Sequence, residues 1–474
     1  MSQPRIDYKW VACLVVCLVT YMIALDEGAV RIILPALGNE YGVRVDDVVW
    51  VWLVYLLVGA GLVLTLGRLG DLFGRKRTYV AGMVLFTVGL SLSAVAPGLV
   101  SLIGVRALQA VGAAMALAMG NAILTAAFPA EERGRALGIL AAVVSIGLLT
   151  GPAAGGALLD ALGWRAVFYV RIPFCVLAIS LMVPLLRSEH MVRKHRGFDY
   201  AGAVTVFTGL AAGLLAINRG QSMGWTSPFV VGLFALAIAS LCAFVLIERR
   251  SRDPVLDLSL FANPVFGAAN AAHSLFYIST IGLRFALPFF LIEALHLPAT
   301  TSGLLLGLVE GVRGIISPVS GRLSDRVGSW ALMTIGMAIV CAGTMPMLRW
   351  GLDATIPGLI PLLMVVGVGM GLVVAPMQST IMGTAPRARL GTASAMVATT
   401  RQIGSSLGLA IAGMAFMQAK VVSETVLLAQ GVAADAVGAQ SSAAGFEAVV
   451  WMAAGFAMLG IVVLVVKGRP VQGR

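Results

Sequence analysis

The sequence predicts an all-α polytopic membrane protein with fourteen transmembrane helices, arranged as six, two and six. Composition is the first observation: 59% of the residues are hydrophobic and 12% are charged, whereas soluble domains are roughly 25% charged. The second is that apolar runs of about 20 residues, the length that crosses a bilayer as a helix, recur along the chain. The third is a loop motif that occurs twice and divides the chain into two similar halves.

Fourteen apolar runs are long enough to span a membrane. They lie near residues 10–34, 48–67, 78–97, 101–127, 136–158, 166–186, 200–218, 228–247, 265–290, 301–321, 330–348, 356–382, 392–418 and 446–466. An even number of spans places both termini on the same side of the membrane. If the amino terminus is cytoplasmic, 22 of the 33 Lys and Arg residues lie in cytoplasmic segments, as the positive-inside rule requires. We therefore expect a multi-pass protein of the inner (plasma) membrane with both termini cytoplasmic. The net charge of +11 then reflects this topology and not binding to nucleic acid.

The first span and the cysteines carry no sign of processing, metal or redox chemistry. Arg5 and Lys9 precede the first apolar run without a small-residue cleavage site, so we expect this span to be retained. All cysteines fall inside predicted spans and lack metal-ligand spacing, which predicts small apolar packing residues and no disulfide. These are Cys13, Cys17, Cys175, Cys242 and Cys341. We expect no metal and no cofactor.

The repeated loop defines the domains. "GRLGDLFGRKR" at 67–77 returns as "GRLSDRVGS" at 321–329, each time at the predicted cytoplasmic end of a helix that enters from outside. Two copies in one orientation indicate parallel halves related by an axis along the membrane normal. The predicted domains are an N-terminal six-helix bundle (1–186), a linker with two extra helices (187–263) and a C-terminal six-helix bundle (264–474).

At these loops the chain resembles the major facilitator superfamily, and within it the fourteen-spanner drug:proton antiporter family. Residues 67–76 follow the superfamily signature between helices 2 and 3, except that Leu72 stands where Arg is usual. The resemblance covers nearly the whole chain and implies the major facilitator fold. It also implies that the two loops form a latch between conformations, with gating residues Gly67, Asp71, Gly74, Arg75, Gly321 and Asp325.

The fifth span contains the most specific motif. "GLLTGPAAGG" at 147–156 matches the antiporter signature GxxxGPxxGG at every fixed position. Small residues allow close helix approach, and a proline bends a helix by removing a backbone donor. A generic glycine-rich interface is the alternative. The resemblance favours a gating surface formed by Gly147, Gly151, Pro152, Gly155 and Gly156.

Three acidic residues lie well inside predicted spans, away from their ends. Membrane-centre charges cost about 2.5–3.5 kcal/mol on insertion scales and are retained for function. Asp26 fits the helix 1 pattern Leu-Asp…Leu-Pro, whose Asp is commonly implicated in proton coupling, and the sequence shows no local partner for it. Glu27 can pair with Arg31 four residues on, and Glu310 with Arg313. We predict proton coupling through Asp26, Glu27 and Glu310, with structural ion pairs as the alternative for the last two.

Arginines exceed acids within the spans. Arg106 and Arg401 match family patterns in the fourth span and in helix 11 of the twelve-helix scheme, whereas Arg31, Arg284 and Arg313 do not. The predicted substrate cavity is lined by Arg31, Arg106, Asn121, Arg284, Arg313 and Arg401. We expect the guanidinium groups of Arg31, Arg106 and Arg284 to converge, which favours neutral amphiphiles or organic anions over bulky cations.

The predicted function is a proton-coupled secondary transporter, expected as a monomer, that exports hydrophobic or amphipathic small molecules by alternating access. The alternatives are an exporter of organic anions or lipid-like metabolites, and a non-transporting receptor on the same scaffold. An ATP-driven pump is disfavoured because the chain lacks a GxxxxGK[ST] phosphate loop. A membrane-embedded enzyme is disfavoured because the chain lacks an HExxH motif and a nucleophile elbow. His273, inside a span, is expected to be a hydrogen-bonded structural histidine.

Overall fold

The computed structural model describes residues 7–59, 62, 74–129, 132–187, 200–250, 258–384 and 390–467. Within this part of the chain, twelve helices are long and apolar enough to cross a membrane, and Val204–Gly220 forms a shorter apolar helix. Residues 50–59 are helical and begin the second predicted span. The all-helical membrane fold predicted from composition and hydropathy is confirmed.

Besides the helical residues 50–59, the N-terminal half contains six labelled helices and the single helical turn α2 (Val45–Val48). The six helices are α1 (Tyr8–Tyr41), α4 (Arg75–Ala94), α5 (Leu99–Ala127), α6 (Arg133–Leu162), α7 (Trp164–Tyr169) and α8 (Ile172–Leu185). The central pair is α9 (Tyr200–Met223) and α10 (Pro228–Arg250), followed by the short helix η2 (Leu258–Ala262). The C-terminal half contains α11 (Pro264–Phe289), η3 (Phe290–Ala294), α12 (Ala299–Val327), α13 (Ser329–Thr344), η4 (Met345–Arg349), α14 (Ile356–Gly383), α15 (Leu390–Ala429) and α16 (Ala434–Lys467).

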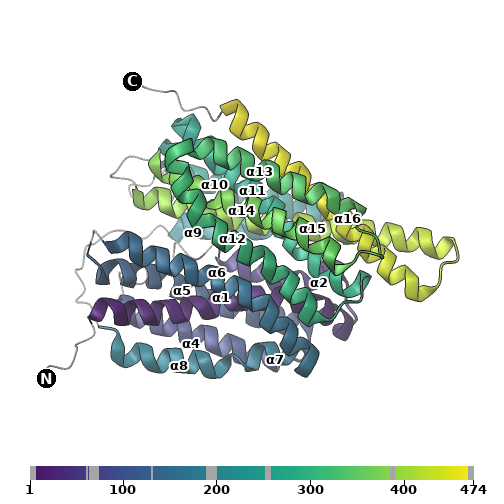
Figure 1. Ribbon diagram of the computed structural model, residues 1–474, viewed down its shortest axis with the longest axis horizontal. Coiled ribbons are helices and arrows are strands. Elements are labelled where there is room, and N and C mark those ends of the chain that lie inside the picture. Colours follow the sequence, from purple (N-terminus) through teal and green to yellow (C-terminus); the bar gives the residue numbers. More distant parts are fainter. Residues whose placement is uncertain are drawn as a thin grey trace.

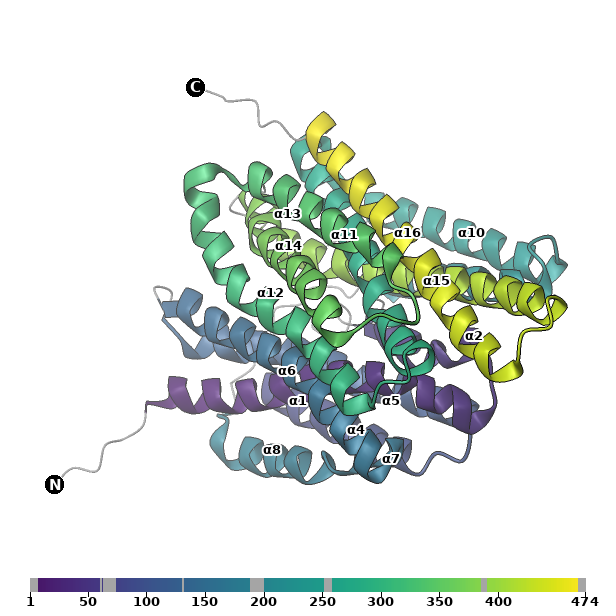
Figure 2. The same ribbon diagram turned by 45° about the vertical axis from the view of Figure 1, so that its right-hand side comes forward.

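The helices form two bundles that lie side by side. Figures 1 and 2 show α1 and α4–α8 in one bundle and α11–α16 in the other, with α6 and α12 adjacent where the bundles meet. The start of α1 and the end of α16 lie at the same end of the molecule, at the left of Figure 1. We call this end the terminal face, and the end where α1 finishes and α12 begins the opposite face.

The sixth predicted span is interrupted. α7 ends at Tyr169 and α8 begins at Ile172. Pro173 lies in the first turn of α8, where a proline is tolerated because backbone N–H groups there make no hydrogen bond within the helix. The turn between them carries Arg171, which is buried and whose guanidinium reaches Asp26 of α1. The interruption therefore places a charged side chain inside the N-terminal bundle.

The extra pair attaches to both halves through α9. Asn218 accepts a hydrogen bond from Trp50 Nε1 (2.7 Å) and donates one to the Asp46 carbonyl (2.9 Å). Arg219 forms an ion pair with Asp47 (3.0 Å), and α9 also packs on α15 of the other half. By contrast, α10 presents a largely accessible apolar surface, which suits contact with lipid.

The two halves meet tightly at the opposite face, between α6 and α12. Asp160 of α6 caps α12: its carboxylate accepts hydrogen bonds from the backbone N–H of Ala299 (3.0 Å) and of Thr300 (2.7 Å). A Cβ added at Gly156 would overlap the Ala299 carbonyl, and one at Gly303 would overlap the Pro152 carbonyl. The opposite face is therefore closed by backbone contact between the bundles.

The glycines of the antiporter signature serve two different contacts. Gly147, Gly151 and Gly155 face α1 within their own half; a Cβ at Gly151 would lie 2.6 Å from the Leu25 carbonyl oxygen. Gly156 and the backbone of Pro152 instead face α12 in the other half. Of the signature's fixed positions, Pro152 and Gly156 contribute to the contact between the halves, and the backbone of Leu149 within the motif also faces Gly307 of α12.

We expect Gly303→Leu to hold the halves apart at the opposite face, because the added side chain cannot fit against the Pro152 carbonyl. Spin labels at Leu162 and Leu352, both accessible at that face, would report a longer and broader distance distribution. The control is Gly455→Leu, at an accessible position of α16 with nothing within 4 Å of an added Cβ. An unchanged distribution in Gly303→Leu would show that this contact does not limit closure.

Candidate functional site

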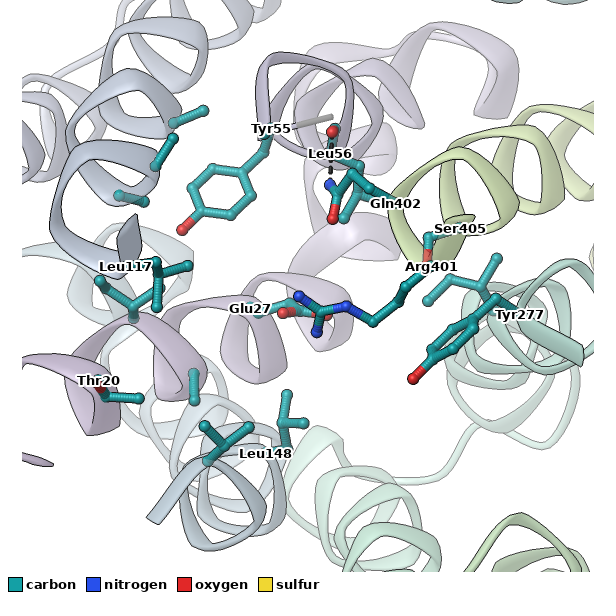
Figure 3. Close-up of a pocket in the computed structure, with 18 of the residues that line it drawn as sticks. Thr20, Glu27, Tyr55, Leu56, Leu117, Leu148, Tyr277, Arg401, Gln402 and Ser405 are labelled. Carbon is teal, nitrogen blue, oxygen red and sulfur yellow. Dashed lines mark hydrogen bonds between the residues drawn. The ribbon is translucent and has the colours of Figure 1, made fainter. Parts of the chain in front are cut away.

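A cavity of about 340 Å³ lies between the two halves (Figure 3). Its walls come from α1, residues 55–59, α5 and α6 on one side and from α11, α12 and α15 on the other. Its volume falls within the range of sites for small organic ligands. The polar residues that line it are Thr20, Glu27, Tyr55, Asn121, Tyr277, Arg284, Arg313, Arg401, Gln402 and Ser405.

The cavity lies toward the terminal face. On α1 the lining residues end at Glu27, one turn before Arg31. On α12, which runs in the other direction, Arg313 lines the cavity and Glu310, one turn nearer the opposite face, does not. Because α6 and α12 are in contact beyond this level, the structure is closed at the opposite face.

Asp26 lies in a buried ion cluster. Its carboxylate is inaccessible and binds Arg106 Nη1 at 2.8 Å and Arg171 Nη1 at 2.7 Å. Arg106 also donates to Gln109 Oε1 (2.7 Å), and its guanidinium lies 4.5 Å from the centre of the Tyr55 ring. Asp26 has no local partner, as the sequence indicated, but it is not unpaired, because both of its partners come from other helices that local sequence spacing cannot reveal.

Glu310 is the centre of a second buried cluster. Its carboxylate lies 3.5 Å from Arg31 Nη1, 3.1 Å from Arg284 Nε and 2.8 Å from Arg313 Nη2. Arg31 belongs to the N-terminal half, whereas Arg284 and Arg313 belong to the C-terminal half. The cluster therefore joins the halves electrostatically at the closed end of the cavity.

One of the two predicted pairs within a helix is present. Arg313 does pair with Glu310, three residues before it. Arg31, however, donates through Nε to the backbone carbonyl of Glu27 (3.3 Å) and directs Nη1 to Glu310, so the predicted Glu27–Arg31 side-chain pair is absent. This leaves the Glu27 carboxylate without an ion pair.

Glu27 and Arg401 are the uncompensated charges of the cavity. Among the described residues, neither side chain has an ion-pair or hydrogen-bond partner, and both line the cavity. Figure 3 shows them projecting into it from α1 and α15. Asp26 and Glu310, by contrast, are both held by arginines.

The predicted cavity residues divide into two groups. Asn121, Arg284, Arg313 and Arg401 line the cavity. Arg31 and Arg106 do not: they are buried behind it in the two ion clusters. The predicted convergence of three arginines was wrong for this reason, since Arg31 and Arg284 share Glu310 whereas Arg106 binds Asp26.

Several site residues were not predicted from the sequence. Tyr55, Tyr277 and Gln402 line the cavity, and Gln402 donates to the Leu56 carbonyl across the halves. Arg171 lies near the outer end of its predicted span. Its position in an apolar run two residues before a proline is the one signal that could have identified it.

The repeated loops are only partly described. Gly67 and Asp71 lie outside the described residues, as does the side chain of Asp325 in α12. Gly74 precedes α4 with φ +93°, and Gly328, at the equivalent place in the second copy, precedes α13 with φ +91°. This left-handed conformation favours glycine. Arg75 is the first residue of α4, and Gly321 lies within α12.

Comparison with known proteins identifies the family. The sequence profile of the Major Facilitator Superfamily matches residues 16–199 and 193–409. The chain belongs to the major facilitator superfamily. It is 30% identical to the riboflavin transporter RibZ of Clostridioides difficile (strain 630) over 86% of this chain and 89% of that protein. It is 32% identical to the multidrug resistance protein Stp of Mycobacterium tuberculosis (strain CDC 1551 / Oshkosh), over 83% and 73%.

A solved structure supports the same fold. The bacterial homolog of the human lysosomal transporter Spinster, in an inward-facing and unoccupied conformation, superimposes over the whole of both chains with a TM-score of 0.70 and 15% identity.

The family and its relatives identify this chain as a membrane transporter of small molecules and not an enzyme. They also support the resemblance to multidrug exporters.

Proposed function

We propose that the protein exports small amphipathic molecules in exchange for protons, by alternating access across the cell membrane. The main support is the Glu27 carboxylate, which lines the cavity and has no ion pair among the described residues. The cavity lies between two halves that are in contact at the opposite face. With both termini cytoplasmic, the terminal face is the cytoplasmic side and the cavity accepts substrate from within the cell. The similarity to the multidrug resistance protein Stp supports export.

Glu27 provides the means of exchange. A neutral substrate that donates a hydrogen bond to its carboxylate favours the deprotonated form, because hydrogen bonding to a charged group stabilises the charge. By linkage, a proton on Glu27 then weakens substrate binding to the same degree. Proton and substrate therefore occupy the cavity alternately, which is the requirement for antiport.

The Glu310 cluster and the Asp160 cap supply the gate in this proposal. Opening the opposite face separates Arg31 from Glu310 and Asp160 from the start of α12. Glu310 keeps Arg284 and Arg313 of its own half when this happens, so its charge stays paired. Movement of the halves as rigid bodies therefore leaves no isolated acid in the C-terminal bundle.

Riboflavin transport is a second candidate function. The similarity to the riboflavin transporter RibZ, which extends over most of both chains, supports it. The cavity suits a planar neutral molecule rich in acceptors, because Tyr55 and Tyr277 present aromatic rings and Asn121 and Gln402 present amide donors.

The sign of proton coupling tests the proposal. The protein is reconstituted into liposomes, and uptake of riboflavin and of chloramphenicol, two neutral amphiphiles, is followed under imposed pH gradients. We expect an acidic interior to drive accumulation of at least one compound and an alkaline interior to prevent it. Protein-free liposomes are the control. If the uptake of both compounds is the same under either pH gradient, proton exchange is refuted.

A further inference from the structure

We propose that Arg284, Arg313 and Arg401 form an anion subsite in the cavity, which binds the carboxylate or sulfonate group of an amphipathic organic acid. This inference deepens the proposed transport function and rests on one part of it, namely that this cavity is the substrate site, and not on exchange for protons. It names the chemical class of substrate for which the C-terminal wall of the cavity is built.

Charge is the first observation. Among the described residues of the cavity and its two clusters, three carboxylates (Asp26, Glu27 and Glu310) face six guanidinium groups (Arg31, Arg106, Arg171, Arg284, Arg313 and Arg401). The formal excess is three positive charges. Like charges withdrawn from water are costly unless counter-charges accompany them. A negatively charged ligand group supplies that compensation in the substrate-bound state.

Donor capacity is the second observation. Each guanidinium carries five N–H donors, yet three arginines share the two oxygens of Glu310. Arg313 uses Nη2, and its buried Nε has no hydrogen-bond partner among the described residues. Arg284 approaches Glu310 through Nε, at 3.1 Å. Both side chains line the cavity wall with further donors, and among the described residues no partner occupies those of Arg401.

The arrangement of the walls is the third observation. The three arginines come from α11, α12 and α15, which all belong to the C-terminal half. The opposing wall contains the apolar side chains of Ile23, Leu117 and Leu148. A ligand with one acidic group and one apolar ring system can direct the acid to the arginines and the rings to the N-terminal half. Planar guanidinium groups favour carboxylate or sulfonate oxygens in this role.

Acid binding has a defined consequence for Glu27. A second negative charge in the cavity favours the neutral form of this carboxyl group, so acid and proton bind together. The charged and titratable groups around Glu27 are Asp26 and Arg31 of its own helix, Tyr55, Arg106, Tyr277, Arg284, Glu310, Arg313 and Arg401. An organic acid should thus take up protons, whereas a neutral substrate of the proposed antiport should release them.

The test uses two probes of nearly the same shape, naphthalene-2-sulfonate and naphthalene-2-sulfonamide. We expect titration calorimetry on the purified full chain to show that the sulfonate binds about tenfold or more tightly. Arg401→Gln and Arg313→Gln should lower sulfonate affinity to the sulfonamide level without changing sulfonamide affinity. Arg401 has no partner among the described residues, so its replacement tests the subsite without disturbing either ion cluster. The control is Arg165→Gln, which removes an arginine paired with Glu40 at the opposite face.

Equal affinity of the wild-type protein for both probes overturns the inference, as does a sulfonate preference that persists in both variants. Loss of the preference in either variant supports it. A pH indicator in weakly buffered solution gives a second readout, for which we expect proton uptake when the sulfonate binds. Failure of riboflavin and chloramphenicol to respond to a pH gradient would refute the antiport and leave these binding results unaffected, so the two failures are distinguishable.

Discussion

Glu27→Gln is expected to abolish proton-driven accumulation of substrate while the protein still folds and binds substrate. Gln has nearly the same shape as Glu but cannot carry a proton. Glu27 has no ion pair among the described residues, so its replacement leaves no buried arginine without a partner. In liposomes with an acidic interior we expect accumulation to fall to the level of protein-free vesicles, whereas exchange of labelled for unlabelled substrate continues.

The matched control is Glu447→Gln, which changes an accessible glutamate of α16 that does not line the cavity. This variant should accumulate substrate like the wild-type protein. If Glu27→Gln also accumulates substrate against its gradient, the proton carrier is another acid, and Asp26 and Glu310 become the candidates to test. If it loses exchange as well as accumulation, Glu27 is needed for substrate binding and not for coupling alone.

The sequence was sufficient for the parts of the fold that depend on local composition. Hydropathy over about 20 residues located the spans because a bilayer requires that length of apolar helix. The repeat of "GRLGDLFGRKR" at 321–329 also predicted two similar halves, and the left-handed Gly74 and Gly328 show that equivalent turns occur in both. Each of these inferences rests on continuous stretches of sequence, read either alone or by comparing two such stretches.

Ion pairing could not be predicted in this way. The partners of Asp26 lie 80 and 145 residues away, at Arg106 and Arg171. Helical spacing reveals only partners three or four residues apart, and it succeeded for Glu310 and Arg313. It failed for Glu27 and Arg31 because Arg31 is directed toward Glu310 of the other half. Local spacing therefore does not show which of the three predicted acids is paired.

The antiporter signature shows a similar limit. Its small residues correctly indicate close helix approach, but they do not identify the neighbouring helix. The structure assigns Gly151 to α1 and Gly156 to α12. Only the second contact lies between the halves, so a bulky residue at Gly151 should disturb the N-terminal bundle itself instead of trapping one conformation.

Asp26→Asn is expected to destabilise the protein by about 3–5 kcal/mol, because it leaves Arg106 and Arg171 buried without their shared counter-charge. The measurement is a denaturant titration in mixed micelles. Asp353→Asn, at an accessible position of the loop before α14, is the control and should have little effect. A structural role for Asp26 also predicts that a second change can compensate for the first.

That compensation separates the two possible roles of Asp26. Replacing Arg171 by Gln in the Asp26→Asn protein removes one of the two unpaired charges, so we expect the double variant to recover part of the lost stability. If Asp26 serves only to neutralise Arg106 and Arg171, the double variant should also recover proton-driven transport, since Glu27 is unchanged. If Asp26→Asn is as stable as the wild-type protein yet cannot use a proton gradient, Asp26 carries the proton. The buried cluster must then open during each cycle to admit water to that carboxylate.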